Sequence, residues 1–329
     1  MPITIEDCGD KRMVTVDGRQ VDRATYHDTR QSVETTLSEQ ALEGLRELNG
    51  ETWLIYHLLR HETKGRYATL GDRLSRLIED FQPKRERTRF LDFGCGTGAS
   101  TAVVARLGYP VVGVEIMPKM LEVARLIARD YGLSDLETFL DVESTKDLPF
   151  EDGEFDGVVT FGVFEHIPPR ERTHYVDECW RVLAPGGILY VVSSPSRLWP
   201  IDGHTSSMPL VHWLPLWLAR PIINRFSRKS DRKYPGDELL YHGLVGINLL
   251  SLLRRLPNSE LCAREGGNTQ FFLRRVHGDT GNRGARRALR AACFGVMGAV
   301  EKPFRRLGLP IDAFLPMVDV AIRKKPSSD

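Results

Sequence analysis

Apolar residues recur at helical spacing between positions 37 and 81, and this pattern predicts helices there. The repeat is interrupted at Asn49-Gly50, a dipeptide typical of turns, and a charged run ends the segment. Residues 1–35 are polar and weakly patterned, so we expect them to be an arm. Residues 1–88 are therefore predicted to form an N-terminal arm and a helical cap.

From residue 89 to residue 196 short apolar runs alternate with stretches of helical spacing. Strands that alternate with helices of about 10–15 residues indicate an α/β fold with a parallel, doubly wound sheet. The predicted strands are residues 90–93, 110–114, 138–142, 157–161 and 188–192, and the predicted helices are residues 100–107, 117–131 and 170–183.

The alternation breaks after Pro195. Residues 197–258 begin with a segment rich in Trp, Pro and Arg and end in a predicted helix, 241–256, so we expect a helical insertion after the fifth strand that acts as a substrate lid. Residues 259–329 are expected to complete the core, with a strand at 260–264, a basic helical segment, 274–308, and a final strand at 318–323.

Composition narrows the class of protein. The chain has 329 residues, of which 41% are apolar and 27% charged, values typical of globular rather than disordered proteins. Its five cysteines are scattered without a C-x-x-C pair, so we expect neither a disulfide scaffold nor a bound metal, and a reducing cytoplasm suits them. The amino terminus has no apolar region of a secretory signal, and no apolar stretch is long enough to span a membrane.

The net charge of +1 conceals an asymmetry between the two parts of the chain. Residues 1–196 carry 23 Lys and Arg against 33 Asp and Glu, whereas residues 197–329 carry 22 against 11. The two parts can attract each other, or the basic face can be merely solvated. The alternative is an anionic partner such as a membrane surface or a phosphorylated substrate. Nucleic acid is not expected, because aromatic residues do not interleave with the basic ones.

A glycine-rich loop follows the first predicted strand of the core. It reads Asp92-Phe-Gly94-Cys-Gly96-Thr-Gly98, and glycines allow a sharp turn and close approach of a ligand to the backbone. The loop also satisfies the loose dinucleotide pattern G-x-G-x-x-[GA], so by itself it leaves the cofactor open. Glu115 ends the second strand, where a carboxylate can accept hydrogen bonds from ribose hydroxyls.

Four blocks between residues 89 and 196 together resemble the class I S-adenosylmethionine-dependent methyltransferases. They are LDFGCGTG, VVGVEIMPKMLEVAR, FLDVESTKDLPFEDGEFDGVVTFGVFEHI and VLAPGGILYVVSSP. The resemblance implies a Rossmann-like seven-stranded sheet whose last strand is antiparallel, with S-adenosylmethionine as the cofactor.

The resemblance also implies roles for individual residues. Asp92 and the three loop glycines Gly94, Gly96 and Gly98 would hold the methionine end of the cofactor, and Glu115 would bind its ribose. The remaining cofactor residues would be Ile116, packed on the adenine, Asp141 at the adenine amino group with the Val142 backbone beside it, and Phe161 near the sulfonium.

Methyl transfer to oxygen needs a group that removes the acceptor proton, and histidine is the usual base near neutral pH. His166 lies just past the fourth strand, and His204 lies in the insertion, where Asp202 is placed to orient its imidazole. We regard both histidines as candidate catalytic residues, whereas His212 lies in an apolar stretch and is expected to be packed.

Residues 203–219 contain no charged side chain, and six basic residues follow between Arg220 and Lys233. Trp and Leu beside a basic run suit either a lid over the acceptor or a segment lying in an anionic membrane interface. Trp213 and Trp217 would share a face if this segment is helical.

These features predict a methyltransferase, cytoplasmic or peripherally membrane-bound, that acts on an oxygen of a small-molecule, glycan or lipid-linked acceptor. Two alternatives stay open from the residues: a scaffold or regulator that binds the cofactor without catalysis, and an NAD-dependent dehydrogenase.

Overall fold

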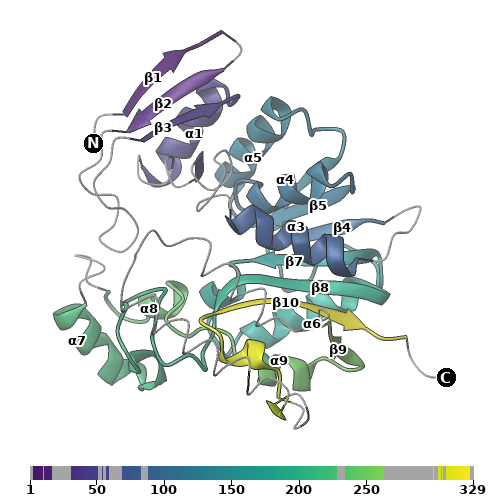
Figure 1. Ribbon diagram of the computed structural model, residues 1–329, viewed down its shortest axis with the longest axis vertical. Helices are drawn as coiled ribbons and strands as arrows, with labels where there is room; N and C mark the ends of the chain where they lie inside the picture. The colour runs from purple at the N-terminus through teal and green to yellow at the C-terminus, as the bar shows by residue number, and fades with distance from the viewer. Residues whose placement is uncertain are drawn as a thin grey trace.

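The computed structural model describes residues 3–9, 11–16, 31–50, 54, 57–58, 69–82, 88–227, 234–262, 299, 303–304, 306 and 309–326. Its centre is a seven-stranded sheet (Figure 1). In spatial order the strands are β6 (Glu137–Asp141), β5 (Val111–Glu115), β4 (Phe90–Phe93), β7 (Phe155–Phe161), β8 (Leu183–Pro195), β10 (Met317–Lys324) and β9 (Ser259–Leu261). The first five are parallel, and β10 runs antiparallel to both β8 and β9. The predicted α/β class and antiparallel last strand are confirmed.

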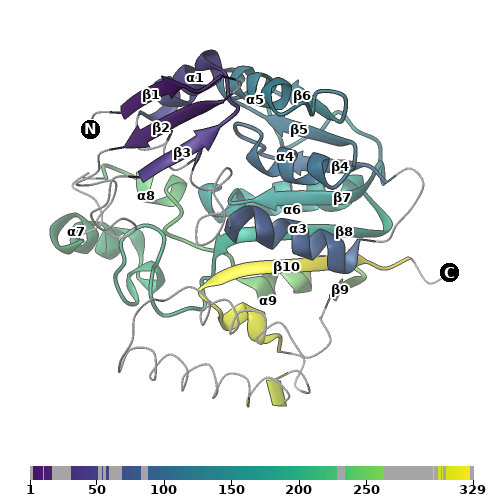
Figure 2. The same ribbon diagram turned by 45° about the horizontal axis from the view of Figure 1, so that its top comes forward.

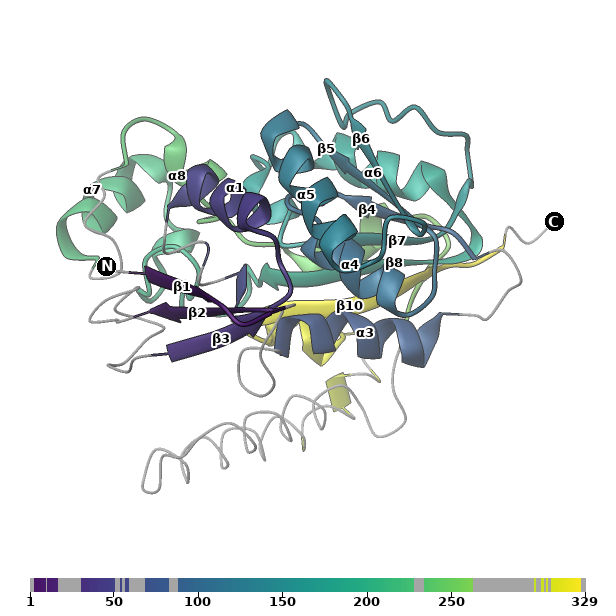
Figure 3. The same ribbon diagram turned by 90° about the horizontal axis from the view of Figure 1, so that it is seen from above.

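Helices cover both faces of this sheet (Figure 3). Strand β4 shows how the sequence specifies the two faces, because successive side chains of a strand point in opposite directions. Phe90 packs in a cluster with α3 (Thr69–Phe81) and α4 (Ala99–Arg106), whereas Leu91 packs in another with α6 (Arg172–Val182) and α9 (Leu249–Arg255). Both residues are fully buried, so this short and mostly apolar run is a strand between two helical layers.

The N-terminal region differs from its prediction. Within the expected arm, β1 (Ile3–Asp7), β2 (Arg12–Val16) and β3 (Gln31–Thr35) form an antiparallel sheet. Val14 and Val33 of this sheet are buried together with residues of α1 (Glu39–Asn49) and α5 (Pro118–Asp130). The strands were missed because each is five residues long and buries little of its length.

Two contacts tie α1 to α5. Ser38 caps α1 by accepting a hydrogen bond from the Ala41 amide, and both its amide and its hydroxyl donate to the Asp130 carboxylate. Gly44 faces Val123 so closely that a Cβ at that position would lie 2.7 Å from a Val123 methyl group. The sequence pattern that predicted helices between residues 37 and 81 is confirmed for α1 and α3 among the described residues.

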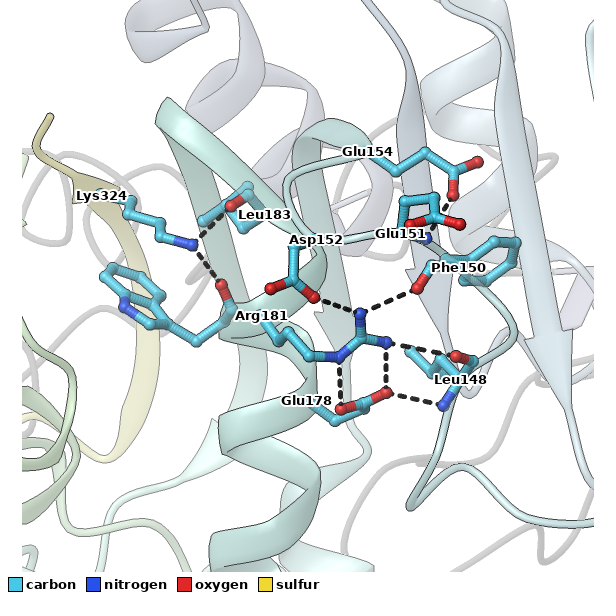
Figure 4. Close-up of polar contacts among 10 residues, drawn as sticks. Leu148, Phe150, Glu151, Asp152, Glu154, Glu178, Arg181, Leu183 and Lys324 are labelled. Atoms are coloured by element: carbon cyan, nitrogen blue, oxygen red, sulfur yellow. Dashed lines mark hydrogen bonds and ion pairs between the residues drawn. The ribbon is translucent and has the colours of Figure 1, made fainter.

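The turn before β7 is held by one arginine of α6 (Figure 4). Arg181 forms a two-pronged pair with Glu178, with N···O distances of 2.9 and 2.7 Å, and contacts Asp152 at 2.7 Å. It also donates to the backbone carbonyls of Leu148 and Phe150. The acidic LPFEDGEFD block therefore has a structural function, since it fixes the entry into β7.

The region after β8 is helical, as predicted, and contains η2 (Val211–Trp213), α7 (Leu216–Phe226) and α8 (Glu238–Tyr241). It has its own buried cluster and lies beside the sheet (Figure 2). Of the helix predicted over 241–256, only α9 is formed, because α8 ends at Tyr241 and residues 242–248 are not helical. Trp213 and Trp217 do not share a helix, because Pro215 separates η2 from α7.

The remaining C-terminal elements are η3 (Ile311–Phe314) and β10, and most of the predicted basic segment 274–308 lies outside the described residues. Among the helices that the structure describes, none combines the length and apolar character needed to cross a bilayer.

Candidate active site

The glycine loop leaves β4 and enters α4. The amides of Gly94 and Cys95 both donate to the Val114 carbonyl of β5, which fixes the loop against the neighbouring strand. A Cβ at Gly98 would lie 3.2 Å from the Phe139 ring, and the φ of +80° also favours glycine. Among the described residues other than its chain neighbours, a Cβ at Gly96 would have only the Met120 sulfur within 4 Å, at 3.9 Å. Gly98 is therefore needed for packing, whereas Gly96 leaves space open beside the loop.

Asp92 lies completely buried beneath this loop. Its Oδ2 accepts hydrogen bonds from Ser100 and Thr101, each at 2.7 Å. Its Oδ1 has no hydrogen-bond partner among the described residues. Burial raises the pKa of Asp92 to about 6, although the two hydroxyls act to lower it. The carboxylate can still accept a hydrogen bond from a cationic ligand group.

Glu115 is the last residue of β5 and links that strand to the glycine loop. Its Oε2 accepts from the Gly96 amide at 3.1 Å, and its Oε1 accepts from Ile116 and Met117 at 2.8 and 3.2 Å. Asp141 is its partner in the ladder between β5 and β6. Asp141 is exposed at the end of β6.

A cavity of about 720 Å³ lies at the carboxyl edge of the parallel strands. Open α/β sheets bind ligands at this edge. The predicted residues that line it are Gly94, Gly96, Glu115, Ile116, Phe161, His166 and His204. The other four predicted residues, Asp92, Gly98, Asp141 and Val142, do not line the cavity itself. Cofactor-side and acceptor-side candidates thus line the same cavity.

The two candidate histidines come together although they are far apart in sequence. His166 belongs to η1 (Phe164–His166), directly after β7, and its ring centroid lies 5.4 Å from that of His204. The Nδ1 of His166 lies 2.7 Å from the Tyr241 carbonyl oxygen, and the Nδ1 of His204 lies 3.1 Å from the His242 carbonyl oxygen. A carbonyl can only accept, so each Nδ1 carries the hydrogen.

The prediction that Asp202 orients the His204 imidazole is wrong. Asp202 accepts from the backbone amides of His204, Thr205 and Ser206 and from the Ser206 hydroxyl. The carboxylate caps its own turn, because nearby backbone amides reach it before the imidazole does. His212 is buried, as its apolar surroundings predicted.

Glu165 was not among the predicted site residues. It lines the cavity, is 1% exposed, and accepts a hydrogen bond of 2.8 Å from the Ser194 hydroxyl. Burial raises the pKa of the Glu165 carboxyl above its usual value. The neighbouring His166 acts in the opposite direction and lowers this pKa. One donor atom from each of Glu165, His166 and His204 lies within 4.8 Å of the others. The sequence signal was the Glu-His pair itself, which was interpreted only for its histidine.

Residues 91–191 match the family described as "Methyltransferase domain". The chain is 32% identical over 126 residues to norajmaline N-methyltransferase of Rauvolfia serpentina, which covers 38% of this chain and 41% of that protein. It is 38% identical over 105 residues to the ubiquinone biosynthesis O-methyltransferase of Xanthomonas oryzae pv. oryzae, which covers 31% and 41%. Among solved structures, the [4+2]-cyclase SpnF is similar with 21% identity and a TM-score of 0.44, over 80% of this chain and 85% of that one.

Both matched enzymes are covered over only about two fifths of their length (41% each). The segment that matches the family contains the glycine loop, Glu115 and the Glu165-His166 pair. Residues 91–191 are therefore a class I S-adenosylmethionine-dependent methyltransferase domain. S-adenosylmethionine is the cofactor of this class.

Proposed function

We propose that the chain transfers a methyl group from S-adenosylmethionine to an oxygen of a small-molecule, glycan or lipid-linked acceptor. The observation that carries the proposal is that Gly96, Glu115 and the two histidines line one cavity. Groups suited to a nucleoside cofactor and groups suited to an acceptor hydroxyl thus surround the same space. We retain the division into a cap (1–88), a cofactor-binding core (89–196), a lid (197–258) and a core completion (259–329).

The chain's own residues fit the cofactor. The unpartnered Oδ1 of Asp92 suits the ammonium of its methionine end, and the open space beside Gly96 admits a ligand against the backbone. Glu115 would bind the ribose hydroxyls, beside the exposed Ile116 at the adenine. The other proposed cofactor residues are Gly94 and Gly98 in the loop, Asp141 and Val142 after β6, and Phe161 at the end of β7.

When bound, S-adenosylmethionine supplies a methyl carbon whose leaving group is already activated. The chain then has to hold the acceptor close to that carbon, exclude water and help the acceptor lose its proton. In the neutral imidazoles of His166 and His204, the hydrogen on Nδ1 leaves Nε2 as the basic nitrogen. We propose that this histidine pair promotes the loss of that proton.

Methyl-³H-labelled cofactor offers a direct test. The purified chain would be incubated with panels of phenols, sugars, lipid-linked glycans and amines, and the product would be located by mass spectrometry. Label in a methyl ether supports the proposal, and label only in an amine contradicts the choice of oxygen. Calorimetry with S-adenosylmethionine and NAD separates the domain from a dehydrogenase, and cofactor binding without turnover across the panels indicates a scaffold.

A lipid-linked acceptor and a membrane surface are supported by the exposed side of the insertion. In α7, Trp217 is 73% exposed, and Pro221 and Arg225 follow it at four-residue intervals on the same exposed side. An exposed tryptophan beside arginine is typical of segments at an anionic lipid interface. We propose that the protein is cytoplasmic and binds such a surface peripherally, with the insertion also serving as the lid.

A further inference from the structure

Glu165, His166 and His204 form a cluster of metal-ligating side chains in the wall of the cavity. We propose that these three residues bind a divalent transition-metal ion, such as Zn²⁺, that takes an oxygen of the acceptor as a further ligand. The proposal rests on the proposed function, because it specifies how the histidine pair acts on the acceptor. One potential ligand atom from each of the three residues lies within 4.8 Å of the others, so the three side chains converge on a space that one ion could occupy.

The imidazoles are held as metal-ligating imidazoles usually are. A histidine that binds a metal through one ring nitrogen commonly donates the other N–H to a carboxylate or a backbone carbonyl. Here both Nδ1 atoms donate to carbonyls of consecutive residues, Tyr241 and His242. The same short segment therefore fixes both rings and selects Nε2 as the metal-binding nitrogen of each.

The side chains of His204 and Glu165 both pack on the backbone of this segment. A Cβ at Gly243 would lie 2.8 Å from the Nδ1 of His204 and 3.3 Å from the Cγ of Glu165, so both side chains pack directly on the glycine. Arg172 donates to the carbonyl of Ile167, next to His166, and to those of Val245 and Gly246. This arginine ties the η1 turn to the segment that orients the rings.

Glu165 is the third proposed ligand, and with the two histidines it forms a known set of metal ligands. The Glu165 carboxylate is buried and is oriented by the Ser194 hydroxyl, and a bound cation would compensate the charge that burial disfavours. Two imidazoles and one carboxylate are a set found in catalytic zinc sites, where a further position stays open for water or substrate. That position would face the space that we assign to the acceptor.

An ion in this position would act on an acceptor hydroxyl as it acts on bound water, whose pKa it lowers towards neutrality. The O–H bond breaks, the proton goes to solvent water, and the electron pair stays on the oxygen held by the ion. The histidines then contribute as ligands rather than by taking the proton themselves. This explains why the two imidazoles and a buried carboxylate converge on one wall of the cavity.

The test uses Co²⁺ and Zn²⁺ as probes of the full-length chain freed of metal by a chelator. Co²⁺ binding is followed by visible absorption and Zn²⁺ binding by calorimetry, without any acceptor. We expect one site, with affinity reduced at least about 100-fold in His166→Ala, His204→Ala and Glu165→Gln, since even outer residues of metal sites contribute about 10–100-fold. His174→Ala, which removes an exposed histidine of α6, is the matched control and should bind as the wild type does.

Cofactor affinity of each variant, measured in parallel, shows that the domain is folded. Equal Co²⁺ affinity in the wild type and in the His166→Ala/His204→Ala double variant overturns the metal site. Methyl transfer that persists in metal-free protein with excess chelator also overturns it and leaves the proposed function standing. If instead the site binds Co²⁺ as expected and no acceptor is methylated with any ion, the proposed function fails while the metal site stands.

Discussion

The Glu115 carboxylate accepts a hydrogen bond from the Gly96 amide, with 3.1 Å between Oε2 and the nitrogen. The second strand of the core thereby holds the loop that follows the first strand. Glu115 also accepts from the amides of Ile116 and Met117, so one carboxylate organises both sides of the proposed cofactor site. Its role therefore includes shaping the loop as well as binding the ribose.

We expect Glu115→Ala to weaken S-adenosylmethionine binding by about 2–4 kcal/mol. Two charge-assisted hydrogen bonds to the ribose would be lost, each contributing about 1.5–3 kcal/mol with some compensation. The free energy of unfolding should fall by only about 1 kcal/mol, since the released backbone amides lie where water can reach them. Isothermal titration calorimetry measures the first quantity and urea denaturation the second.

Glu122→Ala is the matched control for this substitution, because Glu122 is an exposed glutamate in the helix that follows β5. Its cofactor affinity should equal that of the wild type. A dissociation constant that Glu115→Ala leaves unchanged contradicts the ribose assignment. A large loss of stability would instead show that the carboxylate serves the fold.

The histidine pair gives a kinetic prediction. Replacing His166 or His204 by Gln should lower turnover by about 10²–10⁴-fold, because the variant lacks an imidazole that assists removal of the acceptor proton. Cofactor affinity should barely change, since neither imidazole is assigned to the cofactor. Steady-state kinetics with a saturating acceptor measures the effect, and wild-type turnover in both variants would show that positioning alone suffices.

The fold was predictable where local pattern and tertiary burial agree. Strands β4 and β5 are buried on both faces, so their sequences are apolar at nearly every position and were located to within one residue. The final strand β10 was located equally well, but its direction came from the family resemblance. Strands β1–β3 were missed because the sheet is anchored by Val14 of β2 and Val33 of β3, which pack with residues of α1 and α5 in a way that a five-residue pattern does not reveal.

The candidate site likewise has features that the sequence predicted and features that only the structure shows. The glycine loop and Glu115 lie close in sequence to the strands that position them, and they were predicted to bind the same cofactor. The carbonyls of Tyr241 and His242 orient both imidazoles through contacts that no spacing in the sequence indicates. Asp202 failed as a partner of His204 because its own turn supplies closer donors.

A buried carboxyl predicts a pH dependence of stability. Glu137 opens β6, and burial, followed by repulsion from Asp92, raises its pKa from 4.5 to about 8. Between these values the folded protein retains a proton that the unfolded chain has lost, so the stability contributed by this group falls as pH rises. The slope is at most about 1.4 kcal/mol per pH unit. Glu137→Gln should therefore be more stable than the wild type, by a margin that grows from pH 4.5 to about 8.

Urea denaturation of both proteins at pH 5, 6.5 and 8 measures this margin. Taking the difference between variant and wild type removes the titrations that the two proteins share. A margin that stays constant with pH contradicts the raised pKa.

The Arg181 network in Figure 4 predicts a loss of stability. Removing one partner of a fully buried ion pair costs about 3–5 kcal/mol, and the Arg181 side chain is 33% exposed, so Arg181→Met should cost about 1–3 kcal/mol. Arg46→Met is a matched control, because Arg46 pairs with Glu43 at the same helical spacing with both side chains at least half exposed. That surface pair should contribute less than about 1 kcal/mol. Equal losses in urea denaturation would show that the network does not fix the turn.

The exposed side of α7 gives the last prediction. We expect the full chain to co-sediment with vesicles containing phosphatidylglycerol at low salt, and binding should fall as salt rises, since each basic residue near such a surface contributes up to about 1 kcal/mol. Trp217→Ser should weaken binding more than Trp213→Ser, because Trp217 is 73% exposed, whereas the Trp213 indole donates to the Arg197 carbonyl and is 45% exposed. Replacing both should nearly abolish it. Absence of binding to these vesicles, together with unchanged tryptophan emission, would assign the insertion solely to covering a water-soluble acceptor.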